Sequence, residues 1–198
     1  VETGILTIPT LEELILLTQG LNKSTGRNVG IYPETKSSEW HRAQGLFMEE
    51  ALLELLAAYG YEGPDANVIL QSFEPNSLKY MRFELGSELP MAQLIYMESQ
   101  TTEESLDEIA TYATGIGPYK YLIEDAEGNP VNSLALVKGA HARGLVVHPW
   151  TFRSDVLPAY ANSIEDELRR FLFEYGVDGV FIDFPDAAVK LLEAAGYR

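Results

Sequence analysis

Short apolar runs alternate with amphipathic segments along almost the whole chain. Turn residues bound the apolar runs, and such runs predict buried strands. They lie at residues 28–33, 67–73, 91–96, 115–123, 145–150 and 178–183, with the run at 115–123 the weakest. Most are nearly continuous, which is typical of strands that are buried on both faces. The pattern therefore predicts an α/β fold in which parallel strands are joined by helical crossovers.

The segments between these runs have helical spacing of apolar residues. Helices are predicted at residues 10–21, 44–59, 75–85, 102–114, 130–143, 162–175 and 185–195. Thr10 and Glu13 have the spacing of an N-cap and a capping box, and Pro75 suits a first helical turn. Gly144 is the predicted stop after the helix at 130–143. Together with the strands, these helices make about six consecutive βα units.

Two architectures fit such a chain, an open doubly wound sheet and part of a (β/α)8 barrel. No Gly-x-Gly-x-x-Gly follows the first strand, and no Gly-x-x-x-x-Gly-Lys-Ser/Thr occurs anywhere in the sequence. The sequence therefore gives no support for a dinucleotide-binding or P-loop fold. The 198 residues allow one domain, or at most a domain and a half.

The composition excludes several classes of partner. The chain has 30 acidic and 14 basic residues and a formal charge of −16, so nucleic acid and anionic membrane surfaces would repel it. It has no cysteine, which excludes disulfides, thiolate metal sites and a cysteine nucleophile. No apolar run reaches the roughly 18 residues of a membrane span. An acidic protein can still bind an anion where a metal ion or a local lysine reverses the sign of the charge.

Parallel α/β folds place their sites at the carboxyl ends of their strands, so the residues that follow each predicted strand are the candidates for chemistry. The first strand ends in IYPETK. Because side chains alternate along a strand, Glu34 and Lys36 share a face with Tyr32. A carboxylate beside an ammonium group at a strand end suits a metal ion and a phosphate. The alternative is a surface ion pair in a loop.

Two further strands end in polar or aromatic residues. Gln71 shares a face with Ile69 and Phe73, and it is either a hydrogen-bonded core amide or a ligand contact. His148 and Trp150 share a face at the end of the strand at 145–150. A lone histidine is more often structural than catalytic, and a tryptophan at a strand end more often packs than contacts substrate.

The remaining titratable candidates have ordinary explanations. Asp183 and Asp186 follow the last strand, and for one of them capping of the next helix is the favoured interpretation. His141 lies inside a predicted helix and is interpreted as structural. His41 lies in the predicted long loop SSEWHRAQG, at the mouth of the same site. No Ser-His-Asp arrangement, Gly-x-Ser-x-Gly or His-Glu-x-x-His can be assigned.

Six segments in order resemble the glycerophosphodiester phosphodiesterase family. They are IPTLEELI, NVGIYPETK, ILQSFEPNSLKYM, YATGIGPYK, AHARGLVVHPWTFR and GVDGVFIDFPD. The GIGPYK and HPWTFR blocks are most similar to the bacterial periplasmic branch. The resemblance covers essentially residues 1–198 as one domain. It implies a TIM barrel that hydrolyses glycerophosphodiesters to glycerol 3-phosphate and an alcohol, in glycerol and lipid metabolism, in a periplasmic or secreted parent protein.

The resemblance also implies roles for individual residues. Glu34 matches a glutamate that binds a divalent cation, calcium or magnesium, and Lys36 matches a lysine that contacts the phosphate. Gln71 and Phe73 match strand-end residues near the substrate, and Trp150 matches an aromatic wall beside the glycerol. An oxygen-ligated hard cation suits a carboxylate. The implied partner is a small-molecule glycerophosphodiester; the sequence does not indicate an oligomeric state.

The chain departs from the family pattern at its N-terminus. The family's two catalytic histidines and its Glu-x-Asp metal pair lie upstream of the helix at residue 10, and His41 is followed by Arg-Ala. No catalytic residue is therefore assigned in this chain. We expect an N-terminally incomplete enzyme, with the first two βα units missing, that is inactive alone. A (β/α)8 barrel of about 250 residues would account for the shortfall.

Two other functions stay open. The first is a truncated homologue that binds glycerophosphoryl groups or a partner without catalysis. The second is another metal-dependent lipid phosphodiesterase on the same barrel. The reading frame upstream of Val1 separates the first of these from the enzyme.

Overall fold

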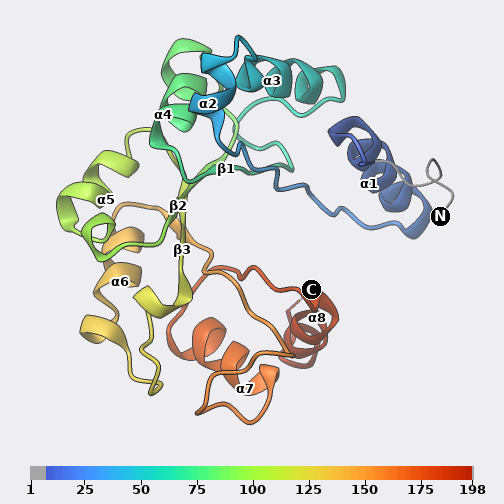
Figure 1. The fold of residues 1–198 in the computed structure, drawn as a ribbon. Helices are drawn as coiled ribbons and strands as arrows, with labels where there is room; N and C mark the ends of the chain where they lie inside the picture. The colour runs from blue at the N-terminus through green and yellow to red at the C-terminus, as the bar shows by residue number, and fades with distance from the viewer. Residues whose placement is uncertain (1–7, 198) are drawn as a thin grey trace, which may run out of the picture. The chain divides into compact units, whose positions relative to one another are not determined.

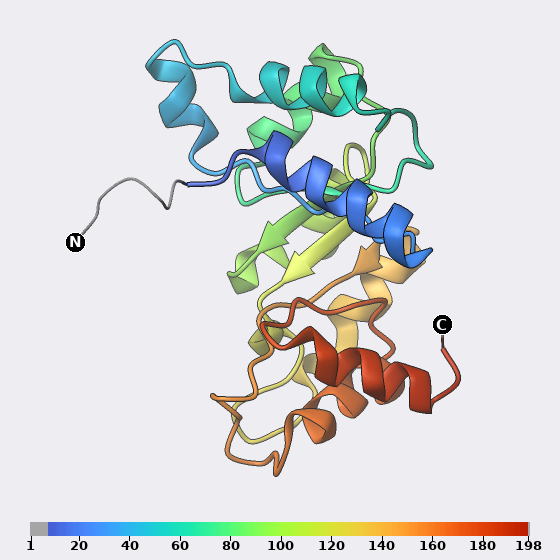
Figure 2. The same cartoon turned by 90° about the vertical axis from the view of Figure 1, so that its right-hand side faces the viewer.

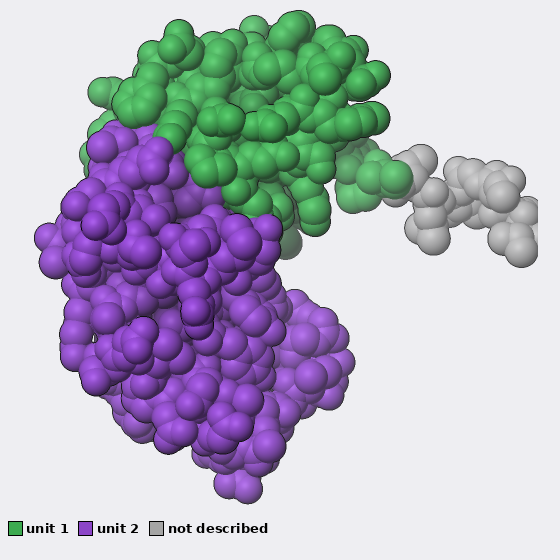
Figure 3. All heavy atoms as spheres, turned by 60° about the vertical axis from the view of Figure 1, so that its left-hand side comes forward, with its two compact units in different colours: residues 1–90 green, residues 91–198 purple. Residues whose placement is uncertain are grey.

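The computed structural model describes residues 8–197, so Val1 and the rest of residues 1–7, and Arg198, lie outside the described residues. The chain divides into two compact units, unit 1 (residues 1–90) and unit 2 (residues 91–198), which Figure 3 colours separately. Each unit is described by itself. Parallel pairing of extended segments occurs within both units, which confirms the predicted α/β class.

Unit 1 contains four helices and one short strand among its described residues. They are α1 (Leu11–Thr25), α2 (Ser38–Ala43), α3 (Met48–Ala58), β1 (Leu70–Ser72) and α4 (Pro75–Lys79), which continues into the π-helical turn η1 (Tyr80–Glu84). Figure 1 shows α2, α3 and α4 gathered together beside β1. The core side chains of this unit include Leu56, Leu70, Leu78 and Met81.

The first helix begins where the sequence predicts. Thr10 is the N-cap of α1, its hydroxyl accepts from Glu13 N–H at 3.2 Å, and Glu13 reaches back to Thr10 N–H at 2.7 Å. The apolar stripe of this helix is buried only at Ile15, whereas Leu17 is 59% exposed. The N-cap and the helical spacing of apolar residues therefore predict this helix, and Ile15 is its buried residue.

The predicted strand at 28–33 is wrong as a regular strand. The segment makes two isolated parallel bridges, Ile31 with Val68 and Glu34 with Gln71. The intervening Pro33 has no N–H to donate, so a continuous ladder cannot form there. The parallel direction and the burial of Ile31 are nevertheless retained.

Unit 2 is built around three parallel strands. They are β2 (Met91–Ile95), β3 (Gly115–Pro118) and β4 (Val146–Val147). Ala92 pairs with Gly115, and Gly115 in turn pairs with Val146. Beyond β4, an isolated parallel bridge joins Phe152 to Ile182, in place of the predicted strand at 178–183. All residues of β2 and β3 are buried, as the continuous apolar runs predict.

Helices follow the strands in unit 2. They are α5 (Glu103–Ile109), α6 (Ala135–Ala142), α7 (Ile164–Arg169) with its π-helical turn η5 (Arg170–Glu174), and α8 (Pro185–Ala194); three short 3₁₀ turns are η2 (Glu98–Gln100), η3 (Lys120–Leu122) and η4 (Val131–Leu134). In Figure 1, α5 and α6 lie on the same side of β2 and β3, and Figures 1 and 2 both show α7 beside α8.

The order of pairing in unit 2 decides between the two architectures left open by the sequence. Each extended segment pairs with the next one along the chain, from β2 through β3 and β4 to Ile182. A doubly wound sheet reverses its strand order at a switch point, whereas barrel strands follow one another in sequence. The pairing is therefore that of consecutive βα units of a barrel.

Candidate active site

Glu34 and Gln71 lie side by side at the end of the parallel pairing in unit 1. They are bridge partners, with Gln71 N–H donating to Pro33 O at 3.0 Å and Thr35 N–H donating to Gln71 O at 2.9 Å. Bridged residues point to the same face of a sheet, so Glu34 and Gln71 share one face. The backbone hydrogen bonds between the two segments therefore fix the position of the Glu34 Cα atom and the face to which its side chain points.

On the opposite face of the same segments, the hydroxyl side chains of Thr35 and Ser72 make hydrogen-bond contacts inside the fold. Thr35 is buried, and its Oγ1 lies 2.9 Å from Ser77 Oγ on α4. Ser72 Oγ donates to Thr35 O at 2.8 Å. With Thr35 turned toward α4, alternation along the chain turns Glu34 and Lys36 to the other face, and both are exposed.

Neither charge at this position is neutralised by a neighbour. Among residues 8–197, the Glu34 carboxylate and the Lys36 ammonium group make no ion pair and no side-chain hydrogen bond. The surface ion pair considered as the alternative for these residues is therefore not formed. The carboxylate of Glu34 and the ammonium group of Lys36 are therefore both available to a ligand at this strand end.

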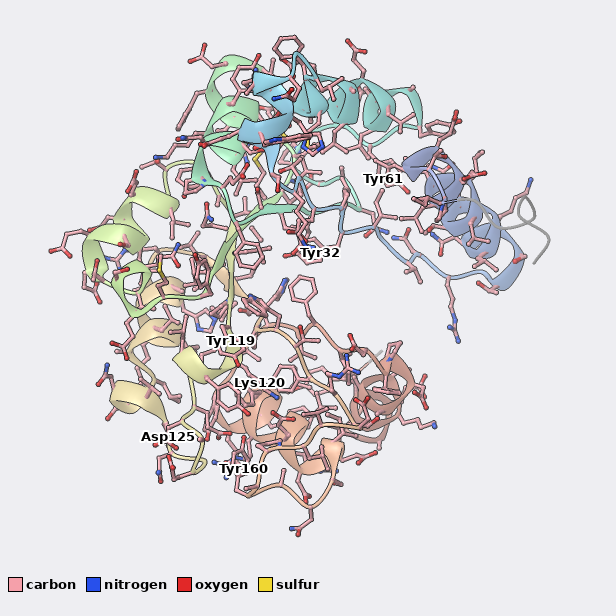
Figure 4. All side chains as sticks on the ribbon, viewed as in Figure 1. Tyr32, Tyr61, Tyr119, Lys120, Asp125 and Tyr160 are labelled. Carbon is pink, nitrogen blue, oxygen red and sulfur yellow. The ribbon has the colours of Figure 1, made fainter. Side chains whose placement is uncertain are left out.

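Gln71 has a structural partner of its own. Its Nε2 donates to Tyr32 O at 3.1 Å, and the residue is 9% exposed, so the core-amide interpretation describes its amide nitrogen. Tyr32, labelled in Figure 4, is partly buried, and burial raises the pKa of its hydroxyl. Phe73 follows β1 directly and is also partly buried.

Trp150 belongs to unit 2 and lies beyond the end of β4, where it forms an isolated parallel bridge with Tyr119. Its Nε1 donates to Gly117 O at 2.7 Å, and its ring lies 4.9 Å from that of Tyr119 at an interplanar angle of 38°. Lys120 N–H donates to Trp150 O at 2.9 Å, which ties the ends of β3 and β4 together. Figure 4 labels Tyr119 and Lys120 at this strand end. The indole is therefore held in one orientation by its own hydrogen bond.

The histidines serve local structure. His41 lies in α2, not in the loop predicted there, and its Nδ1 is 2.8 Å from Ser37 O. His141, at the end of α6, places Nε2 2.9 Å from Asp178 Oδ2. His148 is packed against Gly179, where an added Cβ would lie 3.0 Å from the imidazole. Burial lowers the pKa of His148, and Asp178 opposes that effect.

The two aspartates after the last pairing segment also have nearby partners. Asp183 forms an ion pair with Arg153. Asp186 lies in the first turn of α8, 2.9 Å from Lys190, which together with nearby backbone N–H groups holds the pKa of its carboxyl below the usual value. Phe184 occupies the N-cap position, so the prediction that one of these aspartates caps the helix is wrong. Pro185 at the first helical position sets the register.

The described residues supply part of a metal site at most. Among residues 8–197, no group of three or more histidine, aspartate or glutamate side chains is placed to hold a metal ion. Calcium takes six to eight oxygen ligands and magnesium near-octahedral coordination. Glu34 offers the right donor chemistry for either ion, but only as one member of a larger set.

The sequence interpretation missed a buried ion pair in unit 2. Lys120 Nζ lies 2.7 Å from Glu167 Oε1, and the side chains are 7% and 0% exposed. Burial raises the pKa of Glu167, and Lys120 opposes the shift. The signal was available, because Lys120 follows the end of β3 by two residues. Its side chain points inward to Glu167 on α7 and is buried, so it is not exposed at the strand end.

A second buried carboxylate was also missed. Glu124 is 1% exposed and accepts from Arg170 Nε at 2.9 Å and from the hydroxyls of Tyr160 and Tyr175. Tyr160, labelled in Figure 4, lies on Arg170, with 4.9 Å between the guanidinium carbon and the ring centre. These groups satisfy one another, which is the arrangement of a structural cluster.

The fold and the pairing order define an α/β protein of consecutive parallel βα units. A family model described as the glycerophosphoryl diester phosphodiesterase family matches residues 1–187. The chain belongs to this family. The resemblance read from its six motifs is thereby confirmed.

Named relatives agree with this assignment. The chain is 34% identical to a glycerophosphodiester phosphodiesterase of Haemophilus influenzae, with 94% of this chain and 58% of the relative covered. It is 31% identical to a protein of the same name from Treponema pallidum, with 92% and 59% covered. The chain therefore spans somewhat more than half the length of these relatives.

A solved structure supports the fold. A crystal structure from Silicibacter pomeroyi that carries the name of a glycerophosphoryl diester phosphodiesterase matches with a TM-score of 0.67 at 23% identity. The match covers 96% of this chain and 58% of that one. The predicted fold class, part of a (β/α)8 barrel, is confirmed. In residues 8–197, every helix falls short of the length and apolar character needed to cross a membrane.

Proposed function

We propose that the protein carrying this chain hydrolyses glycerophosphodiesters to glycerol 3-phosphate and an alcohol, and that residues 1–198 form part of its catalytic domain. The observation that carries the proposal is the pair of unneutralised, exposed charges on Glu34 and Lys36 at a strand end. Family membership and the names of the relatives support the same reaction.

Each residue has a role that its chemistry suits. Glu34 would be one carboxylate ligand of a divalent cation, calcium or magnesium, which when bound would neutralise phosphate charge. Lys36 would place an ammonium group at a phosphate oxygen. Gln71 and Phe73, in unit 1, would border the substrate next to Glu34.

The reaction itself needs groups beyond these. Water attacks phosphorus, the bond from phosphorus to the alcohol oxygen breaks, and a proton passes to that oxygen. The chain's histidines are His41, His141 and His148, and none stands in a His-Arg-Gly motif. General acid–base catalysis contributes about 10²–10⁴-fold per group, so we expect the chain by itself to bind substrate with little hydrolysis.

Two measurements test the proposal. The first follows glycerol 3-phosphate release from glycerophosphocholine, with calcium, magnesium or EDTA, for the product of the whole reading frame that contains Val1. Hydrolysis that requires a divalent cation is expected. The absence of hydrolysis with either metal supplied would overturn the enzymatic assignment.

The second measurement is calorimetric binding of glycerol 3-phosphate to the 198-residue chain with and without calcium. We expect Lys36→Met to weaken binding about tenfold, in line with loss of one charge-assisted contact of roughly 1.5 kcal/mol. Glu34→Gln should abolish the calcium effect. The matched controls Lys23→Met and Glu54→Gln, both exposed, should bind as the unchanged chain does.

Binding to the chain combined with no hydrolysis by the whole reading frame would favour a non-catalytic glycerophosphoryl-binding protein. Equal weakening by the control variants would show that Glu34 and Lys36 act only through net charge, and would remove the site assignment.

A further inference from the structure

In unit 1, Lys36 and Ser37 form a two-residue link between two anchored pieces of backbone. Before the link, Thr35 N–H donates to Gln71 O at 2.9 Å, and the Thr35 side chain is buried. After the link, α2 begins at Ser38, whose side chain is also buried. Lys36 and Ser37 themselves are exposed. The position of Lys36 therefore depends on the groups that hold the two ends of the link.

The carboxylate of Glu74 holds the end of the link that leads into α2. It accepts hydrogen bonds from Ser38 Oγ and from Glu39 N–H, the latter at 3.2 Å. Glu39 stands in the first turn of the helix, where backbone N–H groups have no partner inside the helix. The N-cap residue Ser37 makes no side-chain hydrogen bond to the helix, so Glu74 takes the place of the cap.

Glu74 belongs to the same segment that holds the other end of the link. Ser72 Oγ accepts from Glu74 N–H at 3.1 Å and donates to Thr35 O at 2.8 Å. Further along the segment, Ser77 Oγ lies 2.9 Å from Thr35 Oγ1. Ser72 and Ser77 are both buried. The two ends of the link are therefore held by residues 71–77, and this one segment sets the distance between them.

The link contains a strained residue. Ser37 has left-handed backbone angles, with φ 55° and ψ 41°. A residue other than glycine adopts this region at a cost in free energy, and it does so where the surrounding structure imposes it. We expect Ser37 to leave this conformation when the hydrogen bonds to Glu74 are lost. Among residues 8–197 the Lys36 side chain makes no contact that would hold it, so its backbone decides where the ammonium group can reach.

We propose that Glu74 is a positioning residue for Lys36. Its carboxylate fixes the first turn of α2, and thereby fixes the backbone from which the Lys36 ammonium group reaches a phosphate oxygen. The contact with phosphate rests on the proposed function, whereas the fixing of the turn does not. Charge alone predicts the opposite role for Glu74, because a carboxylate close to a phosphate site repels the anion. Removal of Glu74 therefore separates the two explanations by the sign of the change in affinity.

Calorimetric titration of the 198-residue chain with glycerol 3-phosphate measures this sign. Glu74→Ala should weaken binding about threefold, less than the loss expected for Lys36→Met, because the ammonium group is misplaced and not removed. Glu74→Gln should bind within about twofold of the unchanged chain, since its amide oxygen can accept both hydrogen bonds. The exposed Glu54→Ala is the matched control for charge and should not weaken binding. Equal or tighter binding by Glu74→Ala would overturn the proposal.

A general loosening of unit 1 would also weaken binding, so a double variant tests whether the effect passes through Lys36. In the Lys36→Met background, Glu74→Ala should change binding by less than about twofold, because the group that it positions is already gone. The same loss in both backgrounds would show that Glu74 acts on the fold as a whole, and would overturn the proposal.

Amide ¹⁵N relaxation tests the fixing of the turn without a ligand. We expect lower order parameters at Lys36 and Ser37 in Glu74→Ala, with Gln71 in β1 unchanged. If Glu74→Ala does not fold, Ser38→Ala removes one of the two donors and should lower the same order parameters. Unchanged order at Lys36 and Ser37 would overturn the proposal, whatever the chain binds. Lower order in a chain that does not bind glycerol 3-phosphate would support the fixing of the turn and count against the proposed function.

Discussion

Each unit contains a glutamate and a lysine that invite comparison, because their environments are opposite. In unit 1 they are Glu34 and Lys36, and in unit 2 they are Glu167 and Lys120. Glu34 and Lys36 are exposed and unpaired among the described residues. Lys120 and Glu167 are buried and lie 2.7 Å apart. Both pairs draw a residue from just beyond the end of a parallel segment, so position along the chain does not separate them.

The difference shows what distinguishes a binding charge from a structural one. Removing a charge from water is expensive unless a partner accompanies it, so each member of the buried pair depends on the other, and burial keeps both away from a ligand in solvent. The exposed pair keeps its hydration and its open coordination. A strand-end charge is therefore a candidate for function when the fold leaves it unpaired, and a part of the core when the fold pairs it.

The largest expected effect is on the buried pair. Lys120→Met leaves Glu167 as a lone buried charge, and breaking such a pair typically costs about 3–5 kcal/mol. The free energy of unfolding, measured by urea denaturation at pH 7, should fall by that amount. A loss below about 1 kcal/mol would show that the pair is not buried in solution and would break the comparison.

The double variant Lys120→Met with Glu167→Leu is the control for this result. Glu167 Oε2 is buried and accepts no hydrogen bond among the described residues, so the pair is incompletely satisfied. Replacing both members with apolar side chains should therefore recover most of the lost stability. Failure to recover would indicate that packing, not the lone charge, accounts for the loss.

A smaller effect is expected from the pH dependence of His148. Its folded-state pKa lies below the ordinary value of 6.5 because the imidazole is buried, so the unfolded chain binds the proton more readily. Stability from this residue is present above pH 6.5 and is lost as the pH falls through the lowered pKa. The loss amounts to about 1.4 kcal/mol for each pH unit between the two pKa values.

Urea denaturation between pH 7.5 and pH 5.5 measures this effect, and His148→Gln should remove that part of the pH dependence. Asp178 is the charge that opposes the shift, and it also faces His141, so Asp178→Asn should deepen the loss for His148. An unchanged pH profile in His148→Gln would contradict the burial of the imidazole.

The smallest effect on stability is expected for the exposed pair. Glu34→Gln and Lys36→Met remove no contact among the described residues, so each should change the free energy of unfolding by less than about 0.5 kcal/mol. Thermal unfolding of both variants alongside the unchanged chain measures this. A loss comparable to that of Lys120→Met would mean that these charges are structural, and the comparison would collapse.

Local signals in the sequence predicted much of the fold. The capping box at Thr10 and Glu13, the first-turn position of Pro75 and the stop at Gly144 all appear where the pattern places them. These features depend on a few neighbouring residues, so the sequence is sufficient for them. The buried strand β2 was equally clear, because its continuous apolar run is typical of a strand buried on both faces, whereas the run that contains β3 was the weakest of the six.

Other features depended on contacts between distant residues. The helix α2 was predicted as loop because its stability comes from partners such as Glu74, whose carboxylate accepts from Ser38 Oγ and from Glu39 N–H at 3.2 Å. The predicted helices at 75–85 and 162–175 end in the π-helical turns η1 and η5, which no apolar spacing signals. Isolated bridges replaced the first strand, where Pro33 has no N–H to donate, and the last strand, where pairing depends on a partner segment distant in sequence.

By itself the sequence determined the family, the α/β class, the positions of the buried strands and which residue types stand at their ends, because these follow from composition, periodicity and motif order. Only the tertiary structure decided that Glu34 and Lys36 are exposed and unpaired, that Lys120 is buried against Glu167, and that Glu74 accepts hydrogen bonds from the first turn of α2. Burial and pairing are set by side chains that are far apart in sequence, and it is burial and pairing that decide whether a charge stabilises the core or can bind a ligand.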